Sequence, residues 1–285
     1  MWQVLKKIHF HPLLWLVVGI SILTGYFIDL VIVLSILVVH ELGHGVMAHV
    51  LSWRVKRISL LPFGGVAEMD EYGNRSMKEE LFVVLAGPFQ HIWMMFFGWI
   101  FFVMGWIPPY YYEAFMMYNV MILVFNLLPI WPLDGGRLVN ITLHSFFPYI
   151  EANKWSILTS LGLLICLNLS VMFMFPFHFH LWVVLSFLYV SLWREWKQRK
   201  YAHMKFLLER YYGKKTKVTK LKPMKVQSEE LVLTVLERFY KGYKHPVIVI
   251  EDGREAGKLD ENELLFAFFA DKRTMAKAKD LLYLY

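Results

Sequence analysis

Long apolar stretches divide most of this 285-residue chain into segments that are long enough to cross a membrane. Asp, Glu, Lys and Arg are all missing from residues 81–112, 114–133, 138–150 and 155–193. An apolar stretch of about 20 residues can span a bilayer as a helix, in which every backbone polar group is paired internally. The pattern predicts six membrane-spanning helices, at roughly 11–26, 29–51, 80–105, 113–133, 155–175 and 178–196.

The basic residues test this number of spans. Before residue 201, every Lys and Arg falls in the amino-terminal tail, in the loops after the second and fourth spans, or after the sixth span. Because basic residues gather on the cytoplasmic side, this distribution predicts an integral membrane protein with both termini in the cytoplasm. The net charge of +7 is then explained by topology, so we expect the lipid bilayer as a partner and no direct contact with nucleic acid. We also expect the first span to be retained, because no small-residue cleavage site follows it.

The composition changes after Arg194. Residues up to about 225 are rich in Lys and Arg around the segment HMKFLLERYY, which predicts either a helix along an anionic leaflet or a solvated helical linker. Further on, HPVIVIEDG is typical of a strand that ends in a turn, and ENELLFAFFADK is typical of a helix. The predicted fold is an all-α polytopic membrane domain over residues 1–197, a basic amphipathic linker over 198–225 and a small α+β cytoplasmic domain over 226–285.

The stretch HELGH places three polar side chains inside the second predicted span. In a helix, His40 and His44 lie on one face, one turn apart. Two imidazoles at this spacing can bind one zinc ion while Glu41 takes a proton from water, which is the H-E-x-x-H pattern of metalloproteases. The motif is short, but three polar groups at membrane depth are costly unless they serve a function.

A catalytic zinc site needs a third protein ligand besides two histidines. The isolated histidines are more simply explained by hydrogen bonds to helix neighbours, which applies to His49, His91 and His144. Among the carboxylates, Asp134 in NLLPIWPLDGG is favoured, since the prolines break the helix there and the glycines allow a close approach. Asp29 is the rival, but it lies at the opposite end of a span and suits a helix cap. The alternative for Asp134 is also a cap, of the helix GGRLVNITLHSFF.

Taken together, HELGH and NLLPIWPLDGG resemble the two signatures of the site-2 protease family of intramembrane zinc metalloproteases. KRISLLPFGGVAEMDEYGN, LAGPFQHIW and a carboxy-terminal domain similar to a cystathionine-β-synthase (CBS) domain resemble the branch that processes a sporulation sigma-factor precursor, pro-sigma-K. The resemblance covers essentially the whole chain. It implies a protease with a membrane-associated protein substrate and inhibitory membrane protein partners. The implied location is the mother-cell-derived membrane around the forespore, and a homo-oligomer is a further expectation.

When the family's motifs are matched position by position, the resemblance implies one Zn2+ per chain, with His40, His44 and Asp134 as its ligands. Glu41 would act as the general base and later give the proton to the leaving amine. The same signature contains Asn126, which would hold the substrate or polarise the scissile carbonyl, because a developing oxyanion needs a donor besides the metal. The alternative for Asn126 is a hydrogen bond between helices.

Two further parts of the signatures are candidates for substrate contact. Pro132 would shape the turn that presents Asp134. Phe63, Gly64 and Gly65 lie in RISLLPFGGVAE, which the family places in a re-entrant or β-hairpin region beside the active site. A substrate helix must unwind before its peptide bonds are accessible, and an edge strand here could then pair with it. The alternative is an interfacial loop with a Gly-Gly turn.

The domain that resembles a CBS domain suggests a site for ATP or another adenine nucleotide. The matching positions are Asp260 and Glu263, although Asp stands where the family pattern has Thr or Ser. CBS domains usually act in pairs and this chain contains one, so a second copy would be needed to complete a cleft. Docking of the substrate by this domain is the equal alternative.

Two other functions compete with a protease. A CBS-regulated transporter or channel would use the His/Glu cluster as a transit site, but such transporters commonly show repeated halves, and the sequence shows none. A binding protein without activity is disfavoured, because Glu41, the residue most easily lost without harming zinc binding, is present.

Overall fold

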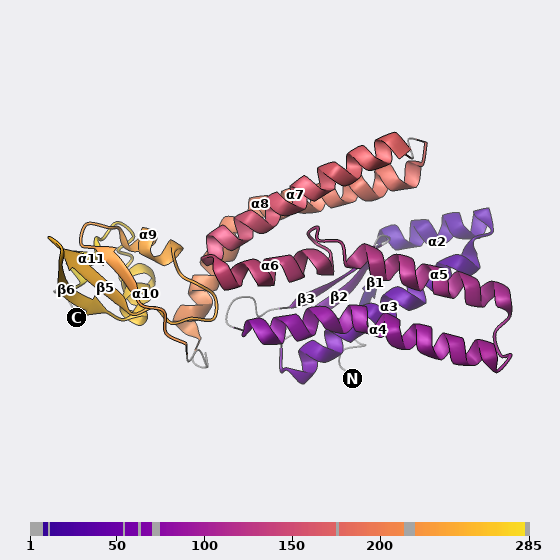
Figure 1. The fold of residues 1–285 in the computed structure, drawn as a ribbon, viewed down its shortest axis with the longest axis horizontal. Helices are drawn as coiled ribbons and strands as arrows, with labels where there is room; N and C mark the ends of the chain where they lie inside the picture. Colours follow the sequence, from indigo (N-terminus) through magenta and orange to yellow (C-terminus); the bar gives the residue numbers. More distant parts are fainter. Residues whose placement is uncertain are drawn as a thin grey trace. The chain divides into compact units, whose positions relative to one another are not determined.

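The computed structural model describes residues 8–10, 12–53, 55–61, 64–69, 75–174, 177–213 and 220–282 (Figure 1). The backbone falls into two compact units, each built from several stretches of chain. The first unit comprises Met1–Glu71, Lys78–Leu138 and Leu163–Leu188. The second unit comprises Tyr72–Met77, Val139–Gly162 and Tyr189–Tyr285.

The apolar part of the chain is mostly helical, as expected (Figure 1). Its helices are α2 (Pro12–Thr24), α3 (Phe27–Val50), α4 (Met77–Val103), α5 (Pro109–Asn126), α6 (Asp134–Phe146), α7 (Tyr149–Met174) and α8 (Phe179–Tyr212). Within the described residues, α3, α4 and α7 are long and apolar enough to cross a membrane, and α2 is a shorter apolar helix. That α2, α5 and α8 also span the bilayer, giving six spans, stays a prediction.

Glycine and proline mark the joints between these helices. Gly25, between α2 and α3, has a φ of 81°, and Gly105, just after α4, has a φ of 74°. Glycine adopts this left-handed conformation without a steric penalty, so the chain can turn sharply there. Pro109 begins α5, where its fixed φ suits the first turn and its missing N–H is not needed.

A small sheet in the first unit corrects the expectation of an all-α membrane domain. Strand β1 (Ile8–Phe10) runs parallel to β2 (Val55–Leu61), and β2 runs antiparallel to β3 (Gly64–Met69), so the order is β1-β2-β3. The β2–β3 hairpin lies in the segment for which the family resemblance offered a re-entrant or β-hairpin region. Strand β1 was not expected, because it has only three residues and its partner lies about fifty positions away in the sequence. A local pattern of apolar residues does not reveal a pairing of that kind.

The second unit contains the other sheet and the small helices after α8. Its strands are β4 (Met224–Gln227), β5 (Val247–Glu251) and β6 (Arg254–Leu259), with β5 in the middle. The helices are α9 (Val232–Glu237), α10 (Glu261–Phe269) and α11 (Ala278–Leu282). The turn between β5 and β6 is Asp252-Gly253, both at positive φ, which is the typical two-residue hairpin loop. The mixture of strands and helices agrees with the expected α+β module, and its likeness to a CBS domain stays a prediction.

Helix α8 continues into the core of the second unit. It runs without interruption to Tyr212, through the first part of the segment expected to be a linker. Phe206 and Leu207 near its end are fully buried in one cluster with Phe239, Leu236 and other apolar side chains of the carboxy-terminal part. The end of α8 is therefore part of the folded module.

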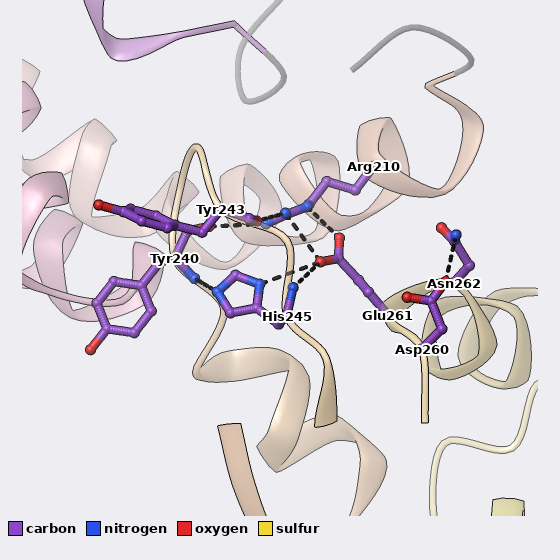
Figure 2. A network of polar contacts seen from close by, with 7 residues as sticks. All are labelled: Arg210, Tyr240, Tyr243, His245, Asp260, Glu261 and Asn262. Atoms are coloured by element: carbon purple, nitrogen blue, oxygen red, sulfur yellow. Dashed lines mark hydrogen bonds and ion pairs between the residues drawn. The ribbon is translucent and has the colours of Figure 1, made fainter. Parts of the chain in front are cut away.

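A buried ion pair fixes the same end of α8 (Figure 2). Arg210 Nε lies 2.8 Å from Glu261 Oε1, in the first turn of α10, and the guanidinium also donates to the backbone carbonyls of Tyr240 and Tyr243. Glu261 in turn accepts a hydrogen bond from the backbone N–H of His245 at 2.9 Å. Both charges are buried and hydrogen-bonded, which is the condition under which a buried ion pair is tolerated.

Candidate metal centre

The histidines of HELGH meet on one face of α3, as the helical spacing requires. His40 and His44 are both buried, and their Nε2 atoms lie 3.1 Å apart. His44 Nδ1 lies 2.8 Å from the backbone carbonyl of Val83 on α4. A carbonyl only accepts hydrogen bonds, so this nitrogen carries the proton, and His44 Nε2 presents a lone pair.

Asp134 joins the two histidines from the first residue of α6. Its Oδ2 atom lies 3.1 Å from the Nε2 of His40 and 3.1 Å from the Nε2 of His44. The structure thus brings Asp134 to two histidines of which the nearer in sequence, His44, is ninety positions away. Asp134 is the first residue of α6 and also faces the two histidines, so a role at the start of the helix does not exclude a role as a metal ligand.

Two glycines make this position of Asp134 possible. A Cβ on Gly135 would lie 2.2 Å from the carbonyl oxygen of Leu127, and one on Gly136 would lie 2.5 Å from the carbonyl carbon of Ile130. Any larger residue would push the loop after α5 away from the start of α6. The Gly-Gly pair therefore holds the loop against the helix that presents Asp134.

The donor set fits a zinc ion. Three donor atoms, two imidazole nitrogens and one carboxylate oxygen, form a triangle with sides of 3.1 Å. Zinc bonds of about 2.0–2.1 Å at tetrahedral angles place ligand atoms about 3.3 Å apart. Buried acceptors converging at this distance repel each other unless a cation lies among them. His₂Asp with a free fourth position is the composition of a catalytic zinc site.

Glycines also let α4 approach this centre. A Cβ on Gly87 would lie 2.2 Å from the Nε2 of His44 and 2.9 Å from the Cε1 of His40. On α3, a Cβ on Gly43 would lie 2.5 Å from the carbonyl oxygen of Ala86. The two helices therefore approach each other closely at the level of the histidines, because glycine leaves room for backbone and imidazole atoms there.

Glu41 and the rival carboxylate Asp29 lie on the same helix but in different surroundings. Glu41 is buried and directly follows His40. Asp29 lies in the first turn of α3, eleven residues before His40, and accepts a hydrogen bond of 2.9 Å from the Tyr118 hydroxyl. At about 1.5 Å per residue it is about 16 Å from His40 along the helix, so it does not belong to the centre.

The other residues of the second signature flank Asp134 in the sequence. Asn126 is the last residue of α5, and its side-chain amide donates to the carbonyl of Ile122 in the same helix at 3.0 Å. This hydrogen bond lies within α5, and a role of Asn126 toward the substrate stays a prediction. Pro132 lies in the loop between α5 and α6, two residues before Asp134.

The candidates near the sheet are only partly described. Phe63 lies outside the described residues. Gly64 and Gly65 begin β3, where they pair with Leu61 and Leu60 of β2. They lie in a hairpin beside α3, paired as strand residues, so the alternative of a Gly-Gly turn is wrong for these two residues.

Asp260 and Glu263 have a structural role that is independent of any ligand. Asp260 precedes α10 as its N-cap, and its backbone N–H donates to Glu263 Oε2 at 2.9 Å, as part of a capping box. This arrangement pairs N–H groups at the start of a helix that would otherwise lack partners. The two residues lie in the second unit and the metal ligands lie in the first.

The comparisons with known proteins agree with the donor set. The profile of Peptidase family M50 matches residues 28–110 and 104–169. The chain is 45% identical over 283 residues to Stage IV sporulation protein FB of Bacillus subtilis (strain 168), covering 99% of this chain and 98% of that protein. The chain belongs to peptidase family M50.

Both the curated sequences and the solved structures include a match of this M50 peptidase from Methanocaldococcus jannaschii. Zinc metalloprotease MJ0392 is 33% identical over 157 residues, covering 52% of this chain and 45% of that protein. The solved structure of the site-2 protease from the same organism superposes with a TM-score of 0.53 at 27% identity, covering 66% of this chain and 89% of that one. The M50 peptidase is accordingly a zinc metalloprotease of the site-2 protease type, integral to the membrane. This membership removes the support for a transporter or channel.

His91 was misread from the sequence. It is fully buried on α4 and contacts His40 of α3 and Asn119 of α5, so its partners are not neighbours on its own helix. The sequence did contain a signal, because LAGPFQHIW places His91 one turn after Gly87 on the helix that packs against HELGH. Without the packing of α4 on α3, that spacing had no interpretation.

Proposed function

We propose that this M50 peptidase cuts the pro-segment of a sporulation sigma-factor precursor, pro-sigma-K, with a zinc ion held by His40, His44 and Asp134. The observation that supports the ligand set is the triangle of donor atoms with sides of 3.1 Å. The support for the substrate is the likeness, over nearly the whole chain, to a protein named for sporulation.

The chemistry needs a base next to the metal. A zinc ion at the centre would polarise a water molecule and the scissile carbonyl. Glu41 would take a proton from the attacking water while the water oxygen forms a bond to the carbonyl carbon. The same carboxyl then gives the proton to the amide nitrogen as the C–N bond breaks, so one water is consumed and a carboxylate and an amine are released. Asn126 would donate to the oxygen that becomes negative during the attack.

The substrate must reach the centre in an extended form. Strand β3 is an outer strand of the sheet, and it lies beside α3. An outer strand offers unpaired N–H and C=O groups, which an extended peptide can pair with. We expect Gly64 and Gly65, together with Phe63, to guide the substrate backbone along this edge toward the metal.

The proposed topology brings a cytoplasmic precursor to the metal. Six spans with both termini in the cytoplasm would put the end of α3 at the inner surface. His44 lies six residues before the end of α3 at Val50, which is about 9 Å along the helix axis. The centre would therefore lie in the cytoplasmic half of the membrane around the forespore, where inhibitory membrane proteins would keep the enzyme inactive.

The carboxy-terminal module extends this proposal to a nucleotide. A CBS-like domain with Asp260 and Glu263 at an ATP site would need a second copy of the chain to complete its cleft. Nucleotide binding and homo-oligomerisation are therefore proposed together, because the nucleotide site would be complete only between two copies.

The replacement Glu41→Gln tests the protease mechanism. We expect it to abolish cleavage of the co-expressed precursor, because the amide cannot take a proton from water, while zinc content and folding stay as in the wild type. The measurements are precursor cleavage on a gel and zinc per chain by elemental mass spectrometry. Glu79→Gln is the control on α4, and it should leave cleavage intact. Full cleavage by the Glu41→Gln variant would contradict the role given to this residue.

A further inference from the structure

A line of buried polar side chains leads away from the metal centre through three helices. His40 Nδ1 lies 3.1 Å from His91 Nε2, and His91 Nδ1 lies 3.0 Å from Asn119 Oδ1. The amide of Asn119 then donates to the backbone carbonyl of Phe115 at 3.0 Å. All three side chains are buried, with His91 and Asn119 at 0% exposure. We call His91 and Asn119 the relay.

The far end of this line fixes the direction of every hydrogen bond in it. The Phe115 carbonyl only accepts, so Asn119 presents its NH₂ group there and its oxygen to His91. His91 Nδ1 must then donate to that oxygen, which leaves Nε2 of the neutral ring as an acceptor. Nε2 of His91 can accept only if His40 Nδ1 carries a proton. The proton on Nδ1 leaves the other nitrogen of His40, Nε2, with a free lone pair.

That free lone pair is on the side where the metal centre lies. His40 Nε2 faces His44 Nε2 and Asp134 Oδ2 at 3.1 Å each. We propose that the relay holds the ring of His40 in the orientation and tautomer that bind zinc, and thereby sets the zinc affinity of the centre. This rests on the proposed function, in which His40 is a ligand. Groups that hydrogen-bond the second nitrogen of a ligand histidine commonly have this effect.

The two ligand histidines depend on different kinds of partner. His44 is oriented by the backbone carbonyl of Val83, which no substitution removes. His40 is oriented by side chains, so its orientation can be removed by changing one residue. A role for His91 as a further ligand does not fit, because its Nε2 lies against His40 Nδ1, the nitrogen of that ring that does not face Asp134.

A measurement of zinc affinity distinguishes a His91 that orients His40 from a His91 that only fills space between the helices. We would compare His91→Leu, which keeps apolar bulk, with His91→Gln, whose amide can accept from His40 and donate to Asn119. The matched control is His49→Leu, which removes an exposed histidine from α3, the helix that carries His40. The dissociation constant for zinc is measured on the purified full-length chain in detergent by competition with a chromophoric chelator. The apo melting temperature is recorded alongside.

We expect His91→Leu to weaken zinc binding about 10- to 100-fold, while His91→Gln stays within about threefold of the wild type and His49→Leu is unchanged. Asn119→Ala, a smaller disturbance, should weaken binding less than His91→Leu does, and it serves as the test should His91→Leu not fold. If both His91→Leu and Asn119→Ala bind zinc with wild-type affinity, the relay is wrong. The relay is also wrong if His91→Gln binds zinc as weakly as His91→Leu.

His40→Ala distinguishes failure of the relay from failure of the proposed function. If His40→Ala loses zinc while both relay variants keep it, the ligand assignment stands and only the relay is refuted. If His40→Ala keeps zinc at wild-type affinity, the ligand set itself is wrong, and the relay falls with it.

Discussion

At the metal centre, a single hydrogen atom on Gly87 stands where any other residue would place a carbon. That carbon would meet His44 Nε2 at 2.2 Å, which is far inside van der Waals contact. The neighbouring atoms are the imidazoles that the zinc proposal uses, so they cannot move aside without leaving the triangle of donors. The requirement for glycine here is therefore set by the metal centre as much as by helix packing.

Gly87→Ala should damage metal binding more than it damages folding. Overpacking of this kind costs about 1–3 kcal/mol, which corresponds to about 5- to 150-fold in zinc affinity when the strain falls on His44. Gly162→Ala on α7 is the control, since a Cβ there meets nothing within 4 Å. Zinc titration of both variants is the measurement, and equal affinities would refute the assignment of strain to the histidines.

Asp134→Asn separates a metal ligand from a helix cap. Asparagine caps helices about as well as aspartate, so a role at the start of α6 alone would change stability by less than about 1 kcal/mol and leave zinc content unchanged. Loss of the negative charge should instead lower zinc content to below half of the wild type and reduce precursor cleavage at least about tenfold. Zinc analysis of the purified variant is the check. Full occupancy would remove Asp134 from the ligand set.

At the residue scale, the sequence was informative where chemistry is local. HELGH places two imidazoles on one helical face by spacing alone, and PLDGG offered a carboxylate next to glycines. Gly87 and His91 stand one turn apart in LAGPFQHIW, but this spacing gains its meaning only from the contact of α4 with α3. Only a fold shows which positions face each other across that contact.

At the scale of elements, the helices followed from apolar length, whereas β1 did not. A run of apolar residues is sufficient to predict a helix in lipid, since the backbone pairs with itself. Strand β1 obtains its hydrogen bonds from β2, far along the chain, so its sequence alone does not indicate a strand. The same reasoning applies to α8, whose apolar span was expected to end near residue 196, followed by a helix along the leaflet or a solvated helical linker. Its polar continuation is stabilised by packing of Phe206 and Leu207 in the second unit.

The ion pair at the end of α8 gives a prediction at this scale. Arg210→Met should destabilise the second unit by about 3–5 kcal/mol, because Glu261 is left as an uncompensated buried charge. The double replacement Arg210→Met with Glu261→Leu should recover part of this loss. Hydrogen exchange of the β5 amides measures the free energy of opening.

The control for this prediction is an exposed ion pair in the same unit. Arg238 Nη1 lies 2.9 Å from Glu230 Oε2, with both side chains partly open to solvent. Arg238→Met should therefore cost less than about 1 kcal/mol. Equal effects of Arg210→Met and Arg238→Met would show that burial of the Arg210 pair is unimportant.

At the scale of the whole molecule, buried histidines make the second unit sensitive to acid. Burial lowers the pKa of His203 on α8 from 6.5 to about 4, against a smaller effect of its hydrogen bond to the Leu236 backbone. Burial also lowers the pKa of His245. Below pH 6.5 the unfolded chain takes up protons that the folded unit does not accept until the pH is much lower. The folded unit therefore keeps its full stability at pH 7, and its free energy of unfolding decreases as the pH falls below 6.5.

We expect the second unit to lose about 2 kcal/mol between pH 7 and pH 5 through His203 alone. Glu261 does not contribute to the loss of stability between pH 7 and pH 5. Burial raises its pKa, but the hydrogen bond with His245 and the charge of Arg210 outweigh burial and lower it, so its contribution disappears only in stronger acid. Hydrogen exchange of the β5 amides at both pH values, corrected for intrinsic rates, is the measurement. His203→Gln should remove most of the difference, and an unchanged difference would assign it to other groups.

The backbone contact between α3 and α4 also determines whether this centre can be moved to another protein. A designed helix with HELGH would bring two imidazoles and a carboxylate, but nothing to hold the rings. A working graft would also need a second helix with glycine opposite the histidines and a carbonyl for His44, and a third segment that begins with Asp-Gly-Gly. The smallest transplantable piece is therefore a set of packed segments, and the five-letter motif is only its most visible part.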